Sequence, residues 1–140
     1  MSTNPHNLLT DHHIRPTQHR LNILAALTGL DKPATVDQVQ SWLHAHRYHP
    51  DQVTIYRNLE LLAAKGLIHQ VDFSDGKARY ELNNTHHHHL VCRNCGQIEP
   101  VFGCVSKSLL TKIEADSGFT VTSHHLEFFG LCQHCQSGGK

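Results

Sequence analysis

The hydrophobic and polar positions of residues 1–82 predict three helices followed by a β-hairpin. Thr35 and Gln38 have the spacing of a capping box, so the second helix is expected to begin after Thr35. The third helix is expected to end near Gly66. The inward positions are Leu21, Ile23, Leu24 and Leu27 in the first helix, Val39, Trp42, Leu43 and His46 in the second, and Ile55, Leu59 and Leu62 in the third.

The hairpin is predicted from residues 67–82, where the period changes from helical to alternating. Residues 74–77, Ser-Asp-Gly-Lys, form a turn signal between two strands. On the second strand Glu81 points away from the face that carries Tyr80 and Leu82. Helices followed by a two-stranded hairpin are typical of a winged helix, in which the third helix enters the major groove of DNA and the hairpin lies along the backbone.

Residues 88–140 predict a second, smaller α/β domain after a polar hinge at 83–87. We expect a strand that follows the hinge and ends in the first Cys-x-x-Cys pair, then strands at 97–101, 119–121 and 126–131, and a helix at about 105–117 that ends at Gly118. The apolar face of that helix is Leu109, Leu110 and Ile113. A domain this small buries little surface alone, so we expect it to form a homodimer through its sheet. The predicted fold is therefore α+β, with a winged-helix domain at 1–82 and a dimerisation domain at 88–140.

Composition restricts the class of partner. The chain has 12 basic and 12 acidic residues and no formal net charge, so it does not resemble a general polyanion binder. Residues 1–10 are polar and predict neither a signal peptide nor a membrane span. We therefore expect a cytoplasmic protein that makes no membrane contact.

Two Cys-x-x-Cys pairs, Cys92–Cys95 and Cys132–Cys135, predict a structural zinc site. Four thiolates satisfy tetrahedral zinc and leave no position for a catalytic water, which argues against a zinc hydrolase. A deaminase would need a proline directly before one Cys-x-x-Cys pair, and none is present. The chain is accordingly predicted not to be an enzyme.

Four consecutive histidines, residues 86–89, end three residues before Cys92. If this run is extended, His87 and His89 point to one face and His86 and His88 to the other. One short strand would then supply ligands to two further metal sites.

Three segments resemble the ferric uptake regulator (Fur) family of metal-sensing repressors. They are Val53–Leu59 (VTIYRNL), His86–Gly96 (HHHHLVCRNCG) and Ser123–Cys132 (SHHLEFFGLC), and the similarity covers roughly residues 15 to 136. The resemblance implies a homodimer with an N-terminal winged helix, which binds a palindromic operator when metal is loaded.

The family's sensing site lies between the two domains. The resemblance matches His87 and His89 to its hinge ligands and Glu81 to its wing carboxylate. Pro33 stands where iron-type members have a histidine, and His69 is the replacement that zinc-uptake members similarly use. The expected sensing set is His69, Glu81, His87 and His89; Glu81 could also be a solvated charge, and His69 a partly buried strand histidine.

A second regulatory site would use His86, His88 and His124. Lys107 replaces the glutamate that the family usually places on the following helix. Cys104 lies three residues before Lys107 and would share its helical face if the helix had already begun at Cys104. Cys104 could be either the fourth ligand of this site or a small buried thiol.

Tyr56 and Arg57 match the positions at which the family contacts DNA. Arg57 could hydrogen-bond to a guanine edge or a phosphate, and Tyr56 could pack against a thymine methyl group. The other expected contacts are Thr54 and Asn58 beside them and Arg20, Lys77 and Arg79 at phosphates.

The function predicted from the sequence is a metal-dependent transcriptional repressor that controls metal uptake. Imidazole-rich ligation favours zinc as the regulatory metal, beside the structural Zn²⁺. Iron(II), Fe²⁺, is the alternative. Peroxide sensing is less expected, because His88 and Pro100 stand where peroxide sensors have aspartates.

Overall fold

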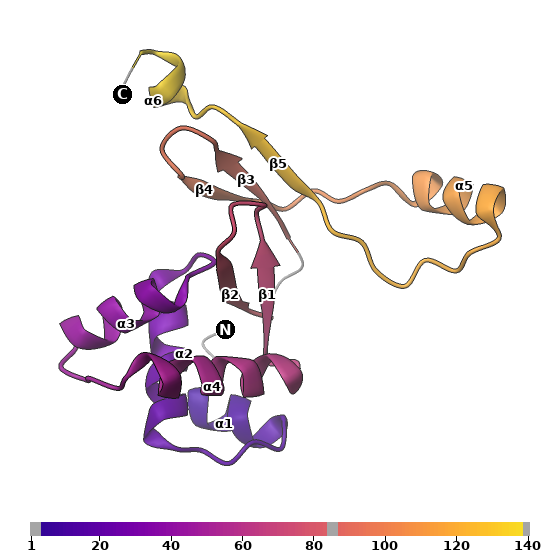
Figure 1. Cartoon of the computed structure of the whole chain (residues 1–140). Helices are drawn as coiled ribbons and strands as arrows, with labels where there is room; N and C mark the ends of the chain where they lie inside the picture. Colours follow the sequence, from indigo (N-terminus) through magenta and orange to yellow (C-terminus); the bar gives the residue numbers. More distant parts are fainter. Residues whose placement is uncertain (1–3, 84–86, 139–140) are drawn as a thin grey trace. The chain divides into compact units, whose positions relative to one another are not determined.

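The computed structural model describes residues 4–83 and 87–138. The chain divides into two compact units, Met1–Asn84 and Thr85–Lys140, called here the N-terminal and the C-terminal unit. The predicted α+β class is confirmed, because helices and a hairpin form the first unit and a mixed sheet with two helices forms the second (Figure 1).

The N-terminal unit is a winged helix with one additional helix at its start. Its elements are α1 (Pro5–Asp11), α2 (Gln18–Leu30), α3 (Val36–Ala45), α4 (Gln52–Ala64), β1 (Ile68–Asp72) and β2 (Ala78–Leu82). Side-chain caps fix where three of the helices begin: Thr17 caps α2, Thr35 and Gln38 form the predicted capping box of α3, and Asp51 caps α4. The predicted inward residues of these helices, including Leu24, Leu59 and Leu62, line or pack against one hydrophobic core, with one exception. His46 was wrongly expected to point inward: it is the exposed residue that ends α3, and Nδ1 of its ring lies 2.8 Å from the carbonyl oxygen of Trp42.

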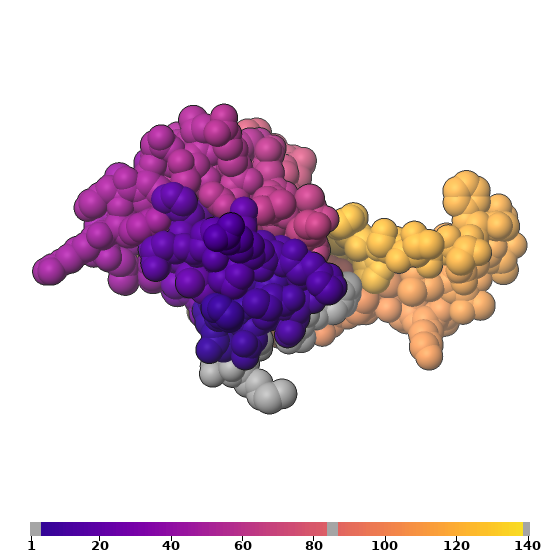
Figure 2. Space-filling model, turned by 90° about the horizontal axis from the view of Figure 1, so that it is seen from below, coloured from indigo at the N-terminus to yellow at the C-terminus, as the bar shows by residue number. Residues whose placement is uncertain are grey.

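Helix α1 was not predicted. Its start carries the usual signals, since Asn4 caps the helix and Pro5 occupies its first turn. The side chain of Leu9 is 0% exposed and belongs to the core. Figure 2 shows these first residues, in indigo, on the outer surface of the N-terminal unit.

The hairpin pairs β1 with β2 in antiparallel register, and His69 lies directly opposite Glu81. Tyr80 is buried in the core, and its backbone forms an isolated bridge with Ala34 before α3. This bridge ties the second wing strand to the helices, and Glu81 consequently points away from the core.

The C-terminal unit contains β3 (His88–Cys92), β4 (Ile98–Val101), α5 (Lys107–Ser117), β5 (Glu127–Gly130) and α6 (Gln133–Gln136). The strand order is β4-β3-β5, with β3 antiparallel to β4 and parallel to β5. Because β3 and β5 are parallel, both strands end at the same edge of the sheet. The segments that follow these strands therefore meet at that edge, which is how this unit positions the cysteines.

The helix of this unit was expected close to its observed position, but one expected strand is absent. Phe119–Val121 is not a strand; the amide of Val121 instead donates a 2.8 Å hydrogen bond to Glu114 of α5. Helix α5 begins only at Lys107, capped by Ser106, and none of its residues is buried. The predicted apolar face of α5 is thus only partly covered within the described chain, since Leu109 and Ile113 are 45% and 43% exposed and Leu110 is half-buried. Within the described ranges 4–83 and 87–138, no helix has the length and apolar character needed to cross a membrane.

Candidate metal centres

The four paired cysteines come together at the edge where β3 and β5 end. Cys92 is the last residue of β3 and lies in register with Gly130, two residues before Cys132. All four sulfurs lie within 4.8 Å of one another, and the Sγ atoms of Cys95 and Cys132 are 3.8 Å apart. With Zn–S bonds of about 2.3 Å, a tetrahedral site requires S–S edges of about 3.8 Å. The sulfurs therefore fit zinc, and their separation is far too long for a disulfide bond.

Hydrogen bonds to the sulfurs favour the thiolate form. Amides of Cys95 and Cys132 lower the pKa of Cys92 to about 6, and the Cys132 amide lies 3.3 Å from its sulfur. The side chain of Asn94 donates to Cys135 at 3.2 Å and lowers the pKa of Cys135, but the neighbouring Cys132 thiol and burial raise it to about 12. The Cys92 thiol thus ionises readily, whereas all four cysteines become thiolates only when a cation binds them.

A second cluster lies at the opposite end of the same sheet. His88 begins β3, Cys104 follows β4 and His124 precedes β5, so the topology collects them at one edge. The Cys104 sulfur is 3.0 Å from Nε2 of His124 and 3.5 Å from Nε2 of His88. His88 is buried and Cys104 is exposed, so the alternative of a small buried thiol is wrong.

Cys104 does not share a helical face with Lys107, because the condition for it is not met: α5 starts three residues after Cys104. Cys104 approaches the cluster from the preceding loop. His86, the other residue expected at this site, lies outside the described residues.

His69 and Glu81 form a cross-strand pair on the wing. Nε2 of His69 lies 3.1 Å from a Glu81 carboxylate oxygen, and Nδ1 of the same ring is hydrogen-bonded to Asn83. The hydrogen bond with Glu81 raises the pKa of His69, and this outweighs the effect of partial burial. Two of the four expected sensing residues are therefore already paired within the N-terminal unit.

The other two expected sensing residues are neighbours in the C-terminal unit. The rings of His87 and His89 lie beside each other, with centroids 4.9 Å apart and planes at 78°. His88 points to the other side, toward His124, at a ring distance of 5.3 Å. The alternation predicted for the histidine run therefore holds for its three described members.

Some of the residues expected to contact DNA are exposed to solvent, whereas others are hydrogen-bonded to neighbouring protein groups. Tyr56, Arg57 and Lys77 are exposed. Arg20 instead donates to Asn58 at 3.1 Å and to the carbonyl of Arg15 at 2.7 Å.

Two further members of that set are held by neighbouring groups. Asn58 donates back to the carbonyl of Thr54 at 2.8 Å. Arg79 pairs with Asp75 at 2.8 Å and lies over the ring of Phe73.

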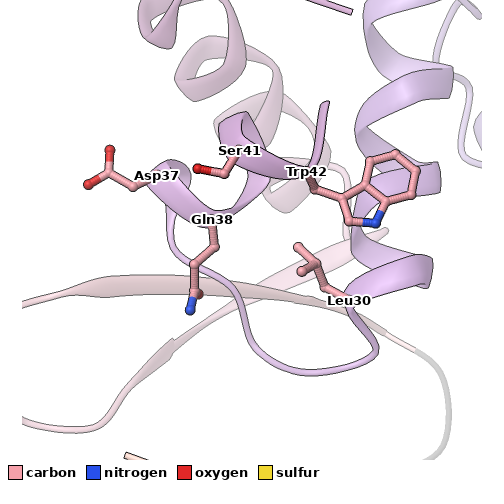
Figure 3. Close-up of a pocket in the computed structure, with 5 residues that line it drawn as sticks. All are labelled: Leu30, Asp37, Gln38, Ser41 and Trp42. Atoms are coloured by element: carbon pink, nitrogen blue, oxygen red, sulfur yellow. The ribbon is translucent and has the colours of Figure 1, made fainter. Parts of the chain in front are cut away.

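A surface hollow of about 390 Å³ lies on the outer side of α3, lined by Leu30, Asp37, Gln38, Ser41 and Trp42 (Figure 3). Trp42 packs closely over Gly29, where an added Cβ would come within 2.8 Å of the indole. Asp37 is the single ionisable residue of this lining, and its carboxylate accepts a hydrogen bond from Gln52. The lining thus contains no acid–base pair of the kind that catalysis needs.

Comparison with known proteins identifies the family. The family model described as "Ferric uptake regulator family" matches residues 11–129. The chain belongs to the ferric uptake regulator family.

Individual Fur-family proteins match along nearly the whole chain. A ferric uptake regulation protein from Neisseria meningitidis serogroup A is 31% identical over 134 residues, covering 94% of this chain and 93% of its own length. The peroxide operon regulator of Bacillus subtilis is 29% identical over 123 residues, covering 87% of this chain and 84% of its own length. The crystal structure of the Vibrio cholerae ferric uptake regulator superposes with a TM-score of 0.79 at 27% identity, over 91% of this chain and 98% of that one.

Membership of the Fur family establishes the class of function. The chain is a metal-responsive transcriptional regulator with an N-terminal DNA-binding and a C-terminal dimerisation domain, and proteins of this family are regulators rather than enzymes. The resemblance to the Fur family found in the sequence is thereby confirmed.

Proposed function

We propose that this Fur-family protein is a zinc-responsive repressor of metal-uptake genes, of the zinc uptake regulator type, which acts in the cytoplasm on palindromic operator DNA. In this proposal Cys92, Cys95, Cys132 and Cys135 hold a structural zinc ion. The sensing ion binds His69, Glu81, His87 and His89 and joins the two units.

The observation that carries the proposal is that each unit presents two donors already side by side. On the wing the donor atoms of His69 and Glu81 are 3.1 Å apart, and in the C-terminal unit the rings of His87 and His89 are 4.9 Å apart. A metal that binds both pairs would restrict how the units are oriented. It can favour the DNA-binding orientation only to the extent that it binds that state more tightly than the others.

The donor set supports zinc as the signal. Three imidazoles and one carboxylate match the nitrogen-rich tetrahedral sites of zinc, whereas manganese prefers oxygen ligands. Iron(II) also binds histidine and carboxylate, so a ferric uptake regulator is the alternative function. Peroxide sensing has less support, because the position of its aspartates is taken by His88 and Pro100.

The exposed face of α4 is the proposed reading surface. Tyr56 is 45% exposed and Arg57 lies next to it, so both can reach base edges or phosphates. Arg20 and Asn58 bond to each other and hold α4 against α2, which assigns them the additional task of positioning the reading helix. Thr54, Lys77 and Arg79 complete the proposed contact surface.

The C-terminal sheet is the proposed dimer interface. Leu90 and Phe128 lie opposite each other in register on β3 and β5, and they are 44% and 46% exposed. Apolar side chains on one sheet face and on α5 remain partly exposed within the described chain, as expected for a surface that a second copy buries.

The test is binding of a labelled palindromic operator to protein that has lost its exchangeable metal but keeps the cysteine-bound zinc. Zinc and then iron(II), the latter anaerobically, are titrated with each free metal buffered. Operator binding at sub-nanomolar free zinc, with iron(II) effective only at far higher levels, is expected. Activation by micromolar iron(II), with zinc effective only well above its buffered cellular range, would overturn zinc sensing and favour the iron alternative.

Two variants test the ligand assignment. His87→Ala combined with His89→Ala should abolish the metal response while the fold and the structural zinc remain. The matched control is His125→Ala, an exposed histidine of the same unit that belongs to neither proposed site. Unchanged metal response in the double variant would refute the proposed sensing set.

A further inference from the structure

The DNA-binding unit has no excess of permanent positive charge. Residues 1–83 carry eight basic and eight acidic side chains, so these charges cancel, and they also carry eight histidines. Two of the basic residues are engaged within the protein, since Arg79 pairs with Asp75 and Arg20 donates to Asn58. DNA binding depends on cations that neutralise phosphates, so the histidines are a further source of the positive charge that this unit needs.

Three exposed histidines, His19, His44 and His49, lie where the winged helix approaches DNA. His44 is in the last turn of α3, and His49 is in the turn that joins α3 to the start of α4 (Figure 1). In a helix-turn-helix the first helix crosses the DNA backbone, and the N-terminal residues of the second helix enter the major groove. The turn and the start of α4 therefore lie beside phosphates when Arg57 reaches the DNA.

We propose that His19, His44 and His49 form a surface that binds DNA phosphates in its protonated form, so that the protein takes up protons when it binds DNA. This inference rests on the proposed reading surface of α4 and extends it. It does not depend on which metal is sensed.

His19 is held near the start of α4. Nδ1 of its ring is hydrogen-bonded to the hydroxyl of Tyr48, which orients the ring and leaves Nε2 as the nitrogen that can donate to a phosphate. Hydrogen bonds from Thr54 lower the pKa of Asp51, and the positive charges of Arg57 and His19 lower it further. The Asp51 carboxylate caps α4 at the surface that DNA approaches, so a cationic His19 offsets the repulsion between this carboxylate and phosphate.

His44 and His49 form a pair whose ring centroids are 4.7 Å apart, with planes at 54°. Arg47 and Asp51 are the charged side chains of the adjoining turn. Two imidazolium cations this close repel each other, so the pair takes up two protons readily only when an anion lies beside both rings. A DNA phosphate is such an anion, and the C-terminal end of α3 also favours a positive charge on His44.

Protonation and DNA binding are therefore linked, and the sign of the linkage is fixed. Histidine changes its charge near about pH 6.5, so above this pH each histidine that meets a phosphate draws a proton from solution. DNA affinity should fall as the pH rises, by up to about tenfold per pH unit for each such histidine. Metal binding has the opposite dependence, because ligands lose protons to bind metal, and it cannot mimic this effect.

The test uses full-length protein with its cysteine-bound zinc, at a buffered free zinc level that saturates the exchangeable sites at each pH. The probe is labelled duplex DNA of mixed sequence, because phosphate contacts do not depend on the bases. Affinity is measured at several salt concentrations between about pH 6 and about pH 8. We expect binding at least about tenfold tighter at the acid end, with a salt slope steeper by about 0.9 for each added phosphate contact.

Substitutions at the three histidines separate charge from shape. The triple variant His19→Gln, His44→Gln and His49→Gln keeps polar side chains but cannot be protonated, so its affinity should not rise on acidification. His49→Arg carries a permanent charge and should bind DNA more tightly than the native protein at the alkaline end. His125→Gln changes an exposed histidine of the C-terminal unit and should keep the native dependence on pH and salt.

Arg57→Ala distinguishes failure of this inference from failure of the reading surface on which it rests. It should weaken binding at every pH and leave the pH dependence in place. Unchanged affinity in Arg57→Ala would overturn the reading surface. Affinity of the native protein that does not rise on acidification, or a triple glutamine variant that keeps the native rise, would overturn the histidine surface alone.

Discussion

The two units of this Fur-family regulator are held together in different ways. The N-terminal unit has a continuous core that includes Leu9, Leu24, Leu59 and Tyr80. Within residues 87–138 of the C-terminal unit, the buried residues are His88, His89, Cys92 and Ile98. Three of those four residues belong to the candidate metal centres, so side chains that bind metal take the place of a hydrophobic core.

This difference shows how one chain can separate stability from regulation. Apolar burial stabilises the winged helix by about 25 cal/mol per Å² of buried surface, and that contribution requires no ion. The C-terminal unit depends on ligands that must lose protons to bind metal, so its stability depends on the supply of metal. Predictions that affect one unit and spare the other can test this distinction.

The largest effect is expected from loss of the structural zinc. Cys132→Ser should unfold the C-terminal unit, because zinc bound to such sites contributes on the order of 10 kcal/mol to folding. The single tryptophan, Trp42, lies in the N-terminal unit, so its fluorescence should still report a folded winged helix. Cys104→Ser is the matched control and should keep the unit folded. A Cys132→Ser protein whose C-terminal unit stays folded and loses only its metal response would contradict the structural assignment.

The next largest effect is expected in the hydrophobic core. Leu59 is 0% exposed, and Leu59→Ala should destabilise the N-terminal unit by about 2–5 kcal/mol, because a cavity remains where the side chain was. Denaturant unfolding followed by Trp42 fluorescence measures this loss, and zinc content should not change. Val53→Ala on the same helix removes a side chain that is 57% exposed, and should change stability by no more than about 0.5 kcal/mol.

A smaller effect is expected at the start of α3. Thr35→Ala removes the hydroxyl that accepts the Gln38 amide at 3.2 Å, and should cost about 1 kcal/mol in the free energy of unfolding. Thr35→Ser keeps the hydroxyl and should stay close to the native protein in the same measurement. If Thr35→Ala and Thr35→Ser have the same free energy of unfolding, the hydrogen bond to the Thr35 hydroxyl does not stabilise α3.

The smallest effect concerns protonation of His69. Its hydrogen bond with Glu81 raises the pKa of His69 above the ordinary value, so protonation stabilises the folded wing. That contribution is fully present below the unfolded pKa and is lost as the pH rises through the higher folded pKa. Titration of the metal-free protein followed by NMR should show a lower His69 pKa in Glu81→Gln, while Glu60→Gln should leave it unchanged.

Local signals predicted much of the fold. The capping box at Thr35 and the hairpin with its turn at residues 74–77 depend on residues close in sequence, so spacing was sufficient. Helix α1 was missed because its stability comes from burying Leu9 against distant helices, which a seven-residue window does not reveal. The strand expected at 119–121 is absent because Glu114 accepts the Val121 amide, a contact that requires the folded helix.

The metal sites were predictable to different extents. The spacing of the two Cys-x-x-Cys pairs is sufficient to predict the zinc site. Cys104 was a weaker inference, because its approach to His88 and His124 depends on the order of the strands in the sheet rather than on helical phase. Lone residues in a loop give no periodic signal, so only the folded chain brings them together.

The parallel pairing of β3 with β5 also has a consequence for biosynthesis. Residues 4–83 contain all the partners of the N-terminal core, so this unit can fold while later residues are still being synthesised. The strand β3 must wait for β5, and Cys92 must wait for Cys135, before the sheet and its zinc site can close. Until Cys135 has left the ribosome, the nascent chain therefore presents a folded DNA-binding unit followed by a segment that has not yet acquired its metal.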